Sequence, residues 1–193
     1  MTHIEASFRE AQDCLAQFIG DAEQFPRVRQ FADRLSETFL AGNKALSCGN
    51  GGSMSDAMHF AEEWSGRYRS ERPPLPAIAF SDPGHMSCVA NDYGYDEVFA
   101  RQVQALGSEG DLLLMLSTSG NSPNLIRAAE EARKRRVTTI GLLGKGGGKL
   151  LPLCDIGIVV PGGTSDRIQE LHIKIIHIVI ETVERRLFPQ LYD

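Results

Sequence analysis

Two glycine- and hydroxyl-rich segments have the residue types of a phosphate-binding site. Residues 49–53 have the sequence Gly-Asn-Gly-Gly-Ser, and residues 117–122 have the sequence Ser-Thr-Ser-Gly-Asn-Ser. Each segment follows an apolar run and precedes a helical pattern, so each would present free backbone N–H groups at a helix N-terminus, where an anion is stabilised. Glycines allow close approach of the backbone, and hydroxyl groups supply neutral donors. Either segment alone would also suit an ordinary turn, but the two together predict a phosphate site.

A third glycine-rich segment lacks the spacing of a nucleotide-binding motif. Residues 144–150, Gly-Lys-Gly-Gly-Gly-Lys-Leu, are similar to a P-loop, but their glycine spacing differs and Leu150 replaces the required Ser or Thr. Residues 49–53 likewise depart from the G-x-G-x-x-G pattern of dinucleotide-binding proteins. We therefore expect no nucleotide cofactor, and we interpret residues 144–150 as a flexible turn.

A histidine and a glutamate are spaced to act as metal ligands or as a proton-transfer pair. His59 and Glu63 are four residues apart in a helix predicted over residues 53–65. Their bearings around the helix differ by about 40°, so both side chains point from one face. Such a pair can bind a divalent metal ion or, with a partner, move a proton. The alternative is an exposed helical pair without a catalytic role.

The last predicted helix, residues 165–187, carries two more candidates. It is apolar over most of its circumference, which predicts burial in a core or in a subunit interface. Gln169 and His177 are eight residues apart and lie about 80° apart around the axis, so they could face one cavity. A lone histidine here would more often be a hydrogen-bonded core residue. With His59 and Glu63 these residues could bind one zinc ion, but spacing alone does not bring the two helices together.

Residues 91–94, Asn-Asp-Tyr-Gly, form the remaining candidate segment. These residue types favour turns, so we expect a loop that follows a helical turn. The functional alternative is that Asn91 and Asp92 face the same crevice as the phosphate segments and hold sugar hydroxyl groups.

The elements that would position these residues alternate between strands and helices. Two helices are predicted within residues 1–42, and an α/β core with a C-terminal helix within residues 43–193. The expected strands are residues 45–48, 76–80, 112–116, 137–143 and 156–160. This pattern predicts one domain over residues 1–193, with a three-layer αβα fold and a five-stranded parallel sheet of flavodoxin-like order 2-1-3-4-5. Ligands bind beyond the carboxyl ends of the first and third strands in that order, where the two phosphate segments would meet.

Composition limits the class of protein. The chain has 193 residues, of which 42% are hydrophobic and 23% charged, as in soluble globular proteins. A net charge of -5 argues against general nucleic-acid binding, and we interpret the basic run at residues 133–136 as a helix C-terminus. The sequence has no apolar stretch of membrane-spanning length and no secretory signal pattern, so we expect no membrane association. The four cysteines form no C-x-x-C motif, which predicts reduced thiols in a cytoplasmic protein.

Several segments resemble the sugar isomerase (SIS) domain family. Residues 47–53, Ser-Cys-Gly-Asn-Gly-Gly-Ser, and residues 56–63, Asp-Ala-Met-His-Phe-Ala-Glu-Glu, carry the resemblance, which is greatest to the bacterial sedoheptulose 7-phosphate isomerases within that family. Further similar segments are residues 66–68, 91–92, 117–122 and 166–172. The resemblance covers nearly the whole chain.

The resemblance implies an activity, a cofactor and an assembly. Members of this branch convert sedoheptulose 7-phosphate to D-glycero-D-manno-heptose 7-phosphate, the first step toward the activated heptose of lipopolysaccharide. They are homotetramers with active sites at subunit interfaces and one zinc ion per subunit. The zinc ligands would be His59, Glu63, Gln169 and His177, and the acid–base pair would be Glu63 and His177. The substrate would contact Asn50, Gly51, Gly52, Ser53, Glu63, Asn91, Asp92, Ser117, Thr118, Ser119, Ser122 and Gln169.

Two other functions remain as alternatives within the same family. One is a non-catalytic SIS tetramer that binds the DnaA replication initiator, whose C-terminal end is similar to Leu187-Phe188-Pro189 here. That relative lacks the acid–base and metal residues, which this chain has at Glu63 and His177. The other is a sugar-phosphate sensor, which would need an attached DNA-binding segment that we do not expect in this chain. The isomerase is therefore the preferred hypothesis.

Overall fold

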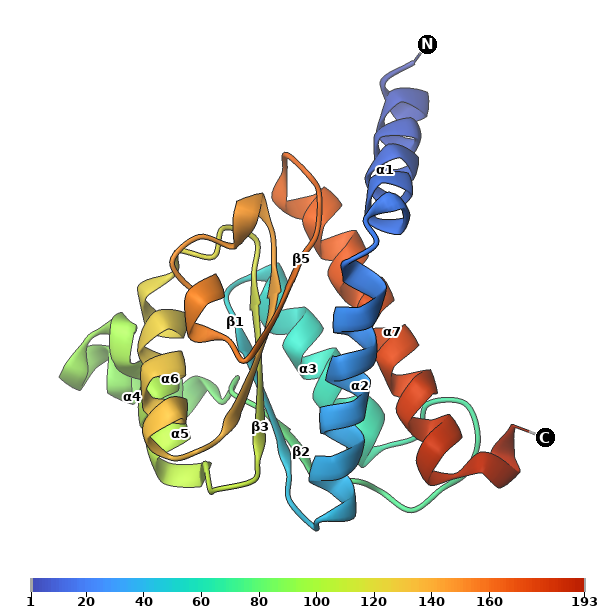
Figure 1. The fold of residues 1–193 in the computed structure, drawn as a ribbon. Coiled ribbons are helices and arrows are strands. Elements are labelled where there is room, and N and C mark those ends of the chain that lie inside the picture. Colours follow the sequence, from blue (N-terminus) through green and yellow to red (C-terminus); the bar gives the residue numbers. More distant parts are fainter. Residues whose placement is uncertain (1, 193) are drawn as a thin grey trace.

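Five parallel strands form the centre of the computed structural model, which describes residues 2–192 (Figure 1). The strands are β1 Ala45–Gly49, β2 Ala77–Ala79, β3 Leu112–Ser117, β4 Thr138–Leu143 and β5 Ile156–Val159. Their order is β2-β1-β3-β4-β5, which confirms the predicted flavodoxin-like sheet. Strands β1 and β3 are neighbours in register, with Gly49 opposite Leu116. The segments that follow these two strands therefore begin side by side at one edge of the sheet.

Helices cover both faces of the sheet (Figure 1). The helices are α1 His3–Gly20, α2 Gln24–Leu40, α3 Gly52–Ser65, α4 Pro83–Tyr93, α5 Val98–Leu106, α6 Pro123–Lys134 and α7 Ser165–Leu187. Short 3₁₀ helices are Tyr95–Glu97, Lys145–Gly147, Leu151–Leu153 and Pro189–Leu191. One apolar cluster joins α2, α3 and α7 to the sheet, and a second joins α4, α5 and α6 to the opposite face.

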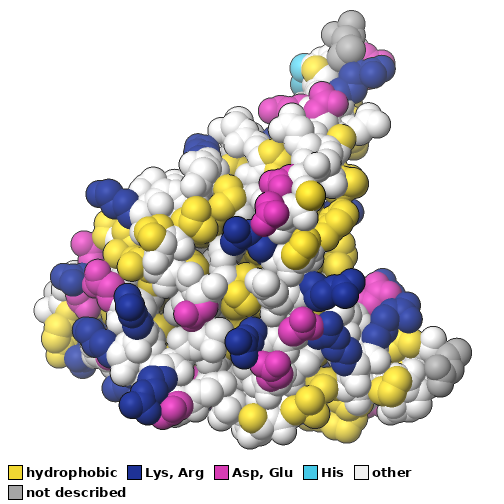
Figure 2. Space-filling model, viewed as in Figure 1, with side chains coloured by type: hydrophobic (Ala, Val, Ile, Leu, Met, Phe, Trp, Pro, Cys, Tyr) yellow, Lys and Arg dark blue, Asp and Glu magenta, His cyan; other side chains and the backbone are white. Residues whose placement is uncertain are grey.

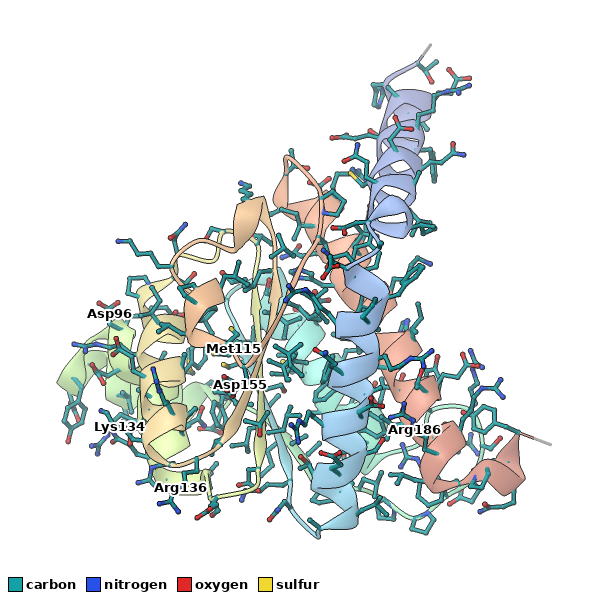
Figure 3. The ribbon with its side chains drawn as sticks, viewed as in Figure 1. Asp96, Met115, Lys134, Arg136, Asp155 and Arg186 are labelled. Carbon is teal, nitrogen blue, oxygen red and sulfur yellow. The ribbon has the colours of Figure 1, made fainter. Side chains whose placement is uncertain are left out.

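The apolar residues of strand β3 contribute to the core on both faces of the sheet. Leu112, Leu114 and Leu116 belong to the cluster under α2, α3 and α7, whereas Leu113 and Met115 belong to the other cluster. Side chains alternate between the faces of a strand, so a continuous apolar run is needed where both faces are covered. Met115 accordingly lies in the interior of the protein (Figure 3).

Of two local predictions, one is confirmed and one is wrong. The basic run at residues 133–136 lies at a helix C-terminus, as predicted, because α6 ends at Lys134. Lys134 and Arg136 point outward, where they pair with Glu131 and Glu109 (Figure 3). The loop predicted at residues 91–94 is wrong, because α4 continues to Tyr93 and only Gly94, at φ +91°, ends it. Turn-forming residue types are also common in the last turn of a helix that a glycine terminates.

All four cysteines are free, and Cys14 and Cys48 are buried while Cys88 is exposed. Within residues 2–192, no helix combines the length and apolar character needed to cross a membrane.

Candidate active site

The two predicted phosphate segments line one cavity of about 280 Å³ at the carboxyl ends of β1 and β3. Its lining residues are Asn50, Gly52, Ser53, Leu116, Ser117, Thr118, Ser119, Ser122, Ser165 and Gln169. They come from the end of β3, the segment that follows it and the N-terminal ends of α3, α6 and α7, where free N–H groups and the helix dipole favour an anion. The lining contains no Lys or Arg among the described residues, so neutral donors would bind the phosphate. Ser165 was not predicted; its position at the start of α7 was the available signal.

Glycines shape both segments. Gly51, the residue before α3, has φ +57°, and Gly120 has φ +64°, a region that side-chain-bearing residues rarely adopt. A Cβ on Gly120 would also collide with the backbone of Gly147. The backbone N–H of Leu150 donates to the carbonyl of Gly120 at 2.9 Å, and that of Lys149 donates to Asn121 Oδ1 at 3.1 Å. The segment that is similar to a P-loop therefore supports the second phosphate segment.

A reciprocal amide pair holds the first segment in place. Asn50 Nδ2 donates to Asn124 Oδ1 at 3.0 Å, and Asn124 Nδ2 donates to Asn50 Oδ1 at 2.9 Å. The Tyr95 hydroxyl group also donates to Asn50 Oδ1 at 3.1 Å. Sequence reasoning missed Asn124, which lies buried one residue into α6 after Pro123.

The predicted sugar-binding residues lie on the surface of α4. Asn91 and Asp92 are exposed, and Asn91 Nδ2 donates to Asp92 Oδ1 at 2.8 Å. Neither side chain lines the cavity that the described residues form around the phosphate segments. Their role in sugar binding stays a prediction.

Helices α3 and α7 bring together three of the four predicted metal ligands. His59 Nε2 lies 2.9 Å from His177 Nε2 and 3.3 Å from Glu63 Oε1. Each of the three residues offers one ligand atom within 4.8 Å of the others, and all three side chains are half-buried. Two imidazole nitrogens and a carboxylate oxygen are suitable ligands for a divalent metal such as zinc. The cluster could therefore hold a metal ion.

The fourth predicted ligand, Gln169, contacts the phosphate cavity. Its Nε2 donates to Ser53 Oγ at 3.3 Å, and its side chain lies against Gly52. Gln169 is two turns before His177 on α7, so it connects the phosphate cavity with the helix that carries the histidine. Its role as a metal ligand stays a prediction.

The surroundings of the cluster shift two titrations in directions that suit proton transfer. Partial burial raises the pKa of the Glu63 carboxyl, the Glu62 charge adds to this, and His59 opposes it. Burial, with His59, Lys174 and Arg69 nearby, lowers the pKa of His177. Near neutral pH, His177 is therefore neutral and able to accept a proton or bind a metal. A carboxylate with a raised pKa is a more effective base.

Comparisons with known proteins find similar sequences over most of the chain. A profile of the SIS domain matches residues 8–144. A phosphoheptose isomerase of Fusobacterium nucleatum is 51% identical over 190 residues, which make up 98% of this chain and 98% of that protein.

Two solved structures have the same fold as this chain. The structure of a phosphoheptose isomerase from Francisella tularensis aligns with a TM-score of 0.91 at 35% identity, over 96% of this chain and 100% of that one. The phosphoheptose isomerase of Neisseria gonorrhoeae aligns with a TM-score of 0.88 at 36% identity, over 94% of this chain and 97% of that one.

Proposed function

The chain belongs to the SIS domain family, and from that premise we propose that it is the isomerase that converts sedoheptulose 7-phosphate to D-glycero-D-manno-heptose 7-phosphate. The observation that carries the proposal is that α3 and α7 contribute residues both to the phosphate cavity and to the His59–Glu63–His177 cluster. A binding module would need the cavity, but it would not need the cluster.

The distance between the two parts suits a long phosphosugar. Ser53 lines the phosphate cavity, and His59 lies six residues later on α3, about 9 Å along the axis. Glu63 lies ten residues after Ser53, about 15 Å along the axis, and its side chain tilts back toward the N-terminal end of the helix. A sugar phosphate that is anchored at its phosphate end can therefore extend along α3 toward His59 and Glu63. Gln169, which contacts Ser53, is positioned to hydrogen-bond the chain between the two ends.

Glu63 and His177 divide the proton transfers. A ketose becomes an aldose when a proton leaves C1 and a proton is delivered to C2, through an enediol. Glu63 takes the carbon-bound proton, because its carboxylate is partly buried and its pKa is raised. His177 moves protons between O1 and O2, because it is neutral near pH 7 and can both donate and accept.

His59, Glu63 and His177 together also fit a zinc ion, and the family resemblance supports Gln169 as the fourth ligand. Groups held by the ion would be weaker bases, so Glu63 and His177 would transfer protons only when they are not bound to it. When bound, zinc would supply a Lewis acid that polarises the substrate carbonyl.

We infer three further properties that the family resemblance supports. Residues 1–193 act as one SIS domain in a cytoplasmic homotetramer, and the product enters lipopolysaccharide heptose synthesis. Large apolar side chains exposed on α1, α2 and α7 suit subunit contacts, and hydrophobic atoms lie along α1 where it meets the body of the protein (Figure 2). These side chains are Ile4, Phe8, Ile19, Phe25, Leu40 and Ile178. The DnaA-binding alternative is not favoured, because such a module has no use for the assembled cluster.

A variant and a control test the assignment of the base. Glu63→Gln removes the carboxylate at nearly constant volume and is expected to lower kcat on sedoheptulose 7-phosphate by about 10²–10⁴-fold. Glu37→Gln removes an exposed carboxylate on α2, away from the cluster, and should keep most of the activity. If Glu63→Gln turned over substrate as fast as Glu37→Gln, Glu63 would not be the base.

A further inference from the structure

The irregular segment between α3 and β2 is held by one stripe of α7. His177, Glu181 and Glu184 have the spacing i, i+4 and i+7, so they lie on one face of that helix. Each contacts a residue of the segment 66–72, which runs beside the C-terminal half of α7 (Figure 1). The segment without regular structure is therefore fixed at three heights along the helix that carries His177.

Arg72 is the buried anchor of this segment. Its Nε lies 2.6 Å from Glu184 Oε1, and both side chains are fully buried. The same guanidinium donates to the carbonyl oxygens of Glu63, Trp64 and Gly66, at the C-terminal end of α3. Carbonyl groups at a helix end lack partners within the helix, so a buried arginine satisfies them. Arg72 thus ties the end of α3 to α7.

Arg69 and Tyr68 form a stack that ends on the imidazole of His177. The Tyr68 ring lies over the His177 ring, with centroids 6.0 Å apart and planes 28° apart. The Arg69 guanidinium lies over the Tyr68 ring at 5.1 Å, and Arg69 Nη2 pairs with Glu181 Oε2 at 3.0 Å. His59 approaches His177 edge-on, with centroids 5.0 Å apart. The imidazole is therefore bounded by Tyr68 on one side and by His59 on another.

We propose that Tyr68 is a positioning residue that fixes the plane of the His177 imidazole, so that its Nε2 points at His59 and Glu63. The χ2 torsion angle, which rotates a histidine ring, has a broad and nearly two-fold distribution, so the backbone alone does not fix the ring plane. Tyr68 supplies the missing restraint, and Arg69 with Glu181 holds Tyr68 against the ring. The consequence for catalysis rests on the function proposed above, whereas the consequence for ring orientation and metal binding does not.

Three variants separate positioning from simple packing. Tyr68→Phe keeps a flat ring on His177, whereas Tyr68→Leu fills part of the space without one. Arg69→Met removes the contact between the Arg69 guanidinium and the Tyr68 ring from an exposed position, so it tests the proposal even if Tyr68→Leu folds poorly. Tyr93→Leu is the matched control. It removes another Arg–Tyr stack, in which the Arg101 guanidinium lies 4.5 Å from the ring centroid, at the end of α4 and away from segment 66–72.

The first readout is the NMR signal of His177 in metal-free protein without substrate. A ring under Tyr68 has its C–H resonances shifted by the aromatic ring current. This shift should persist in Tyr68→Phe and Tyr93→Leu and disappear in Tyr68→Leu. The second readout is zinc affinity, measured by competition with a chromophoric chelator. Residues that orient metal ligands typically change affinity about 10–100-fold, which is the loss expected for Tyr68→Leu, with a smaller loss for Arg69→Met.

Turnover provides the third readout. In Tyr68→Leu, kcat should fall with little change in KM, and Tyr68→Phe should restore it. The proposal would be overturned if the NMR shift, the zinc affinity and kcat of Tyr68→Leu and Arg69→Met were all equal to those of Tyr93→Leu. If no variant or wild-type protein turned over substrate while the shift and zinc affinity changed as described, the proposed function would fail and the positioning role would stand.

Discussion

His172 makes the stability of the folded protein sensitive to acid. Its side chain on α7 has no exposed surface, and burial lowers its pKa from 6.5 to about 4. In the unfolded chain the imidazole regains its ordinary pKa. Between pH 6.5 and pH 4 the unfolded chain therefore binds a proton that the folded protein does not, so stability is lost as the pH falls through this window.

The lowered pKa of His172 determines how much stability is lost. A difference of about 2.5 pKa units between the unfolded and folded states corresponds to about 3 kcal/mol in the free energy of unfolding, at 1.36 kcal/mol per unit. Asp56 works in the opposite direction, because burial raises its pKa to about 6 and its protonation then favours the folded state as the pH falls. The pH dependence of the wild-type stability alone therefore does not isolate the contribution of His172, whereas the difference between wild type and a His172 variant does.

The assay is urea unfolding of wild type and His172→Leu at pH 7 and pH 4, at one fixed protein concentration because assembly adds to stability. Wild type should lose about 3 kcal/mol more than His172→Leu between the two pH values. His3→Leu, at an exposed position on α1, should behave like wild type. Equal losses in wild type and His172→Leu would refute the argument.

Three further predictions concern the anchor, the phosphate segment and the metal. Arg72→Met should lower the free energy of unfolding by about 3–5 kcal/mol in denaturant titration, because it leaves the buried Glu184 carboxylate without its cationic partner. The double variant Arg72→Met/Glu184→Leu should recover part of this loss, and no recovery would contradict the pairing. Gly120→Ala should raise KM at least tenfold and lower the melting temperature, since it strains a left-handed residue and collides with the neighbouring glycine-rich turn, whereas Gly163→Ala, with open space around it, should match wild type in both. Zinc at about 100 times its Kd should stabilise chelator-treated protein by about 2.7 kcal/mol in thermal unfolding, and an equal gain in His59→Ala would place the metal elsewhere.

The sheet could be predicted because its signals are local and mutually consistent. Apolar runs such as residues 112–116 are too short for helices and are bounded by turn residues, and the helices between them carry amphipathic periodicity. Chirality and crossover rules then leave few strand orders. Once β1 and β3 are neighbours, the two phosphate segments must meet, so the cavity followed from the fold. Local patterns failed at residues 91–93, because turn-forming types also occur within a helix end.

The rest of the site depends on packing between distant segments. His59 and His177 are separated by 118 residues, and no periodicity specifies that α3 and α7 pack with these two faces opposed. The buried Arg72–Glu184 pair that helps to join the helices is not visible in the sequence either, since charged residues are more often exposed. Tyr68 had no motif of its own beyond the family resemblance of residues 66–68. Its place over His177 follows from the course of an irregular segment.

The most direct test of the isomerase is incubation of the purified protein with sedoheptulose 7-phosphate in D₂O, followed by NMR. The account predicts D-glycero-D-manno-heptose 7-phosphate with deuterium at C2, because the proton taken by Glu63 exchanges with solvent at the enediol stage. Heptose 7-phosphate without label would contradict transfer through a solvent-exchanging base. No product, from a folded protein that still binds phosphate, would contradict the isomerase itself.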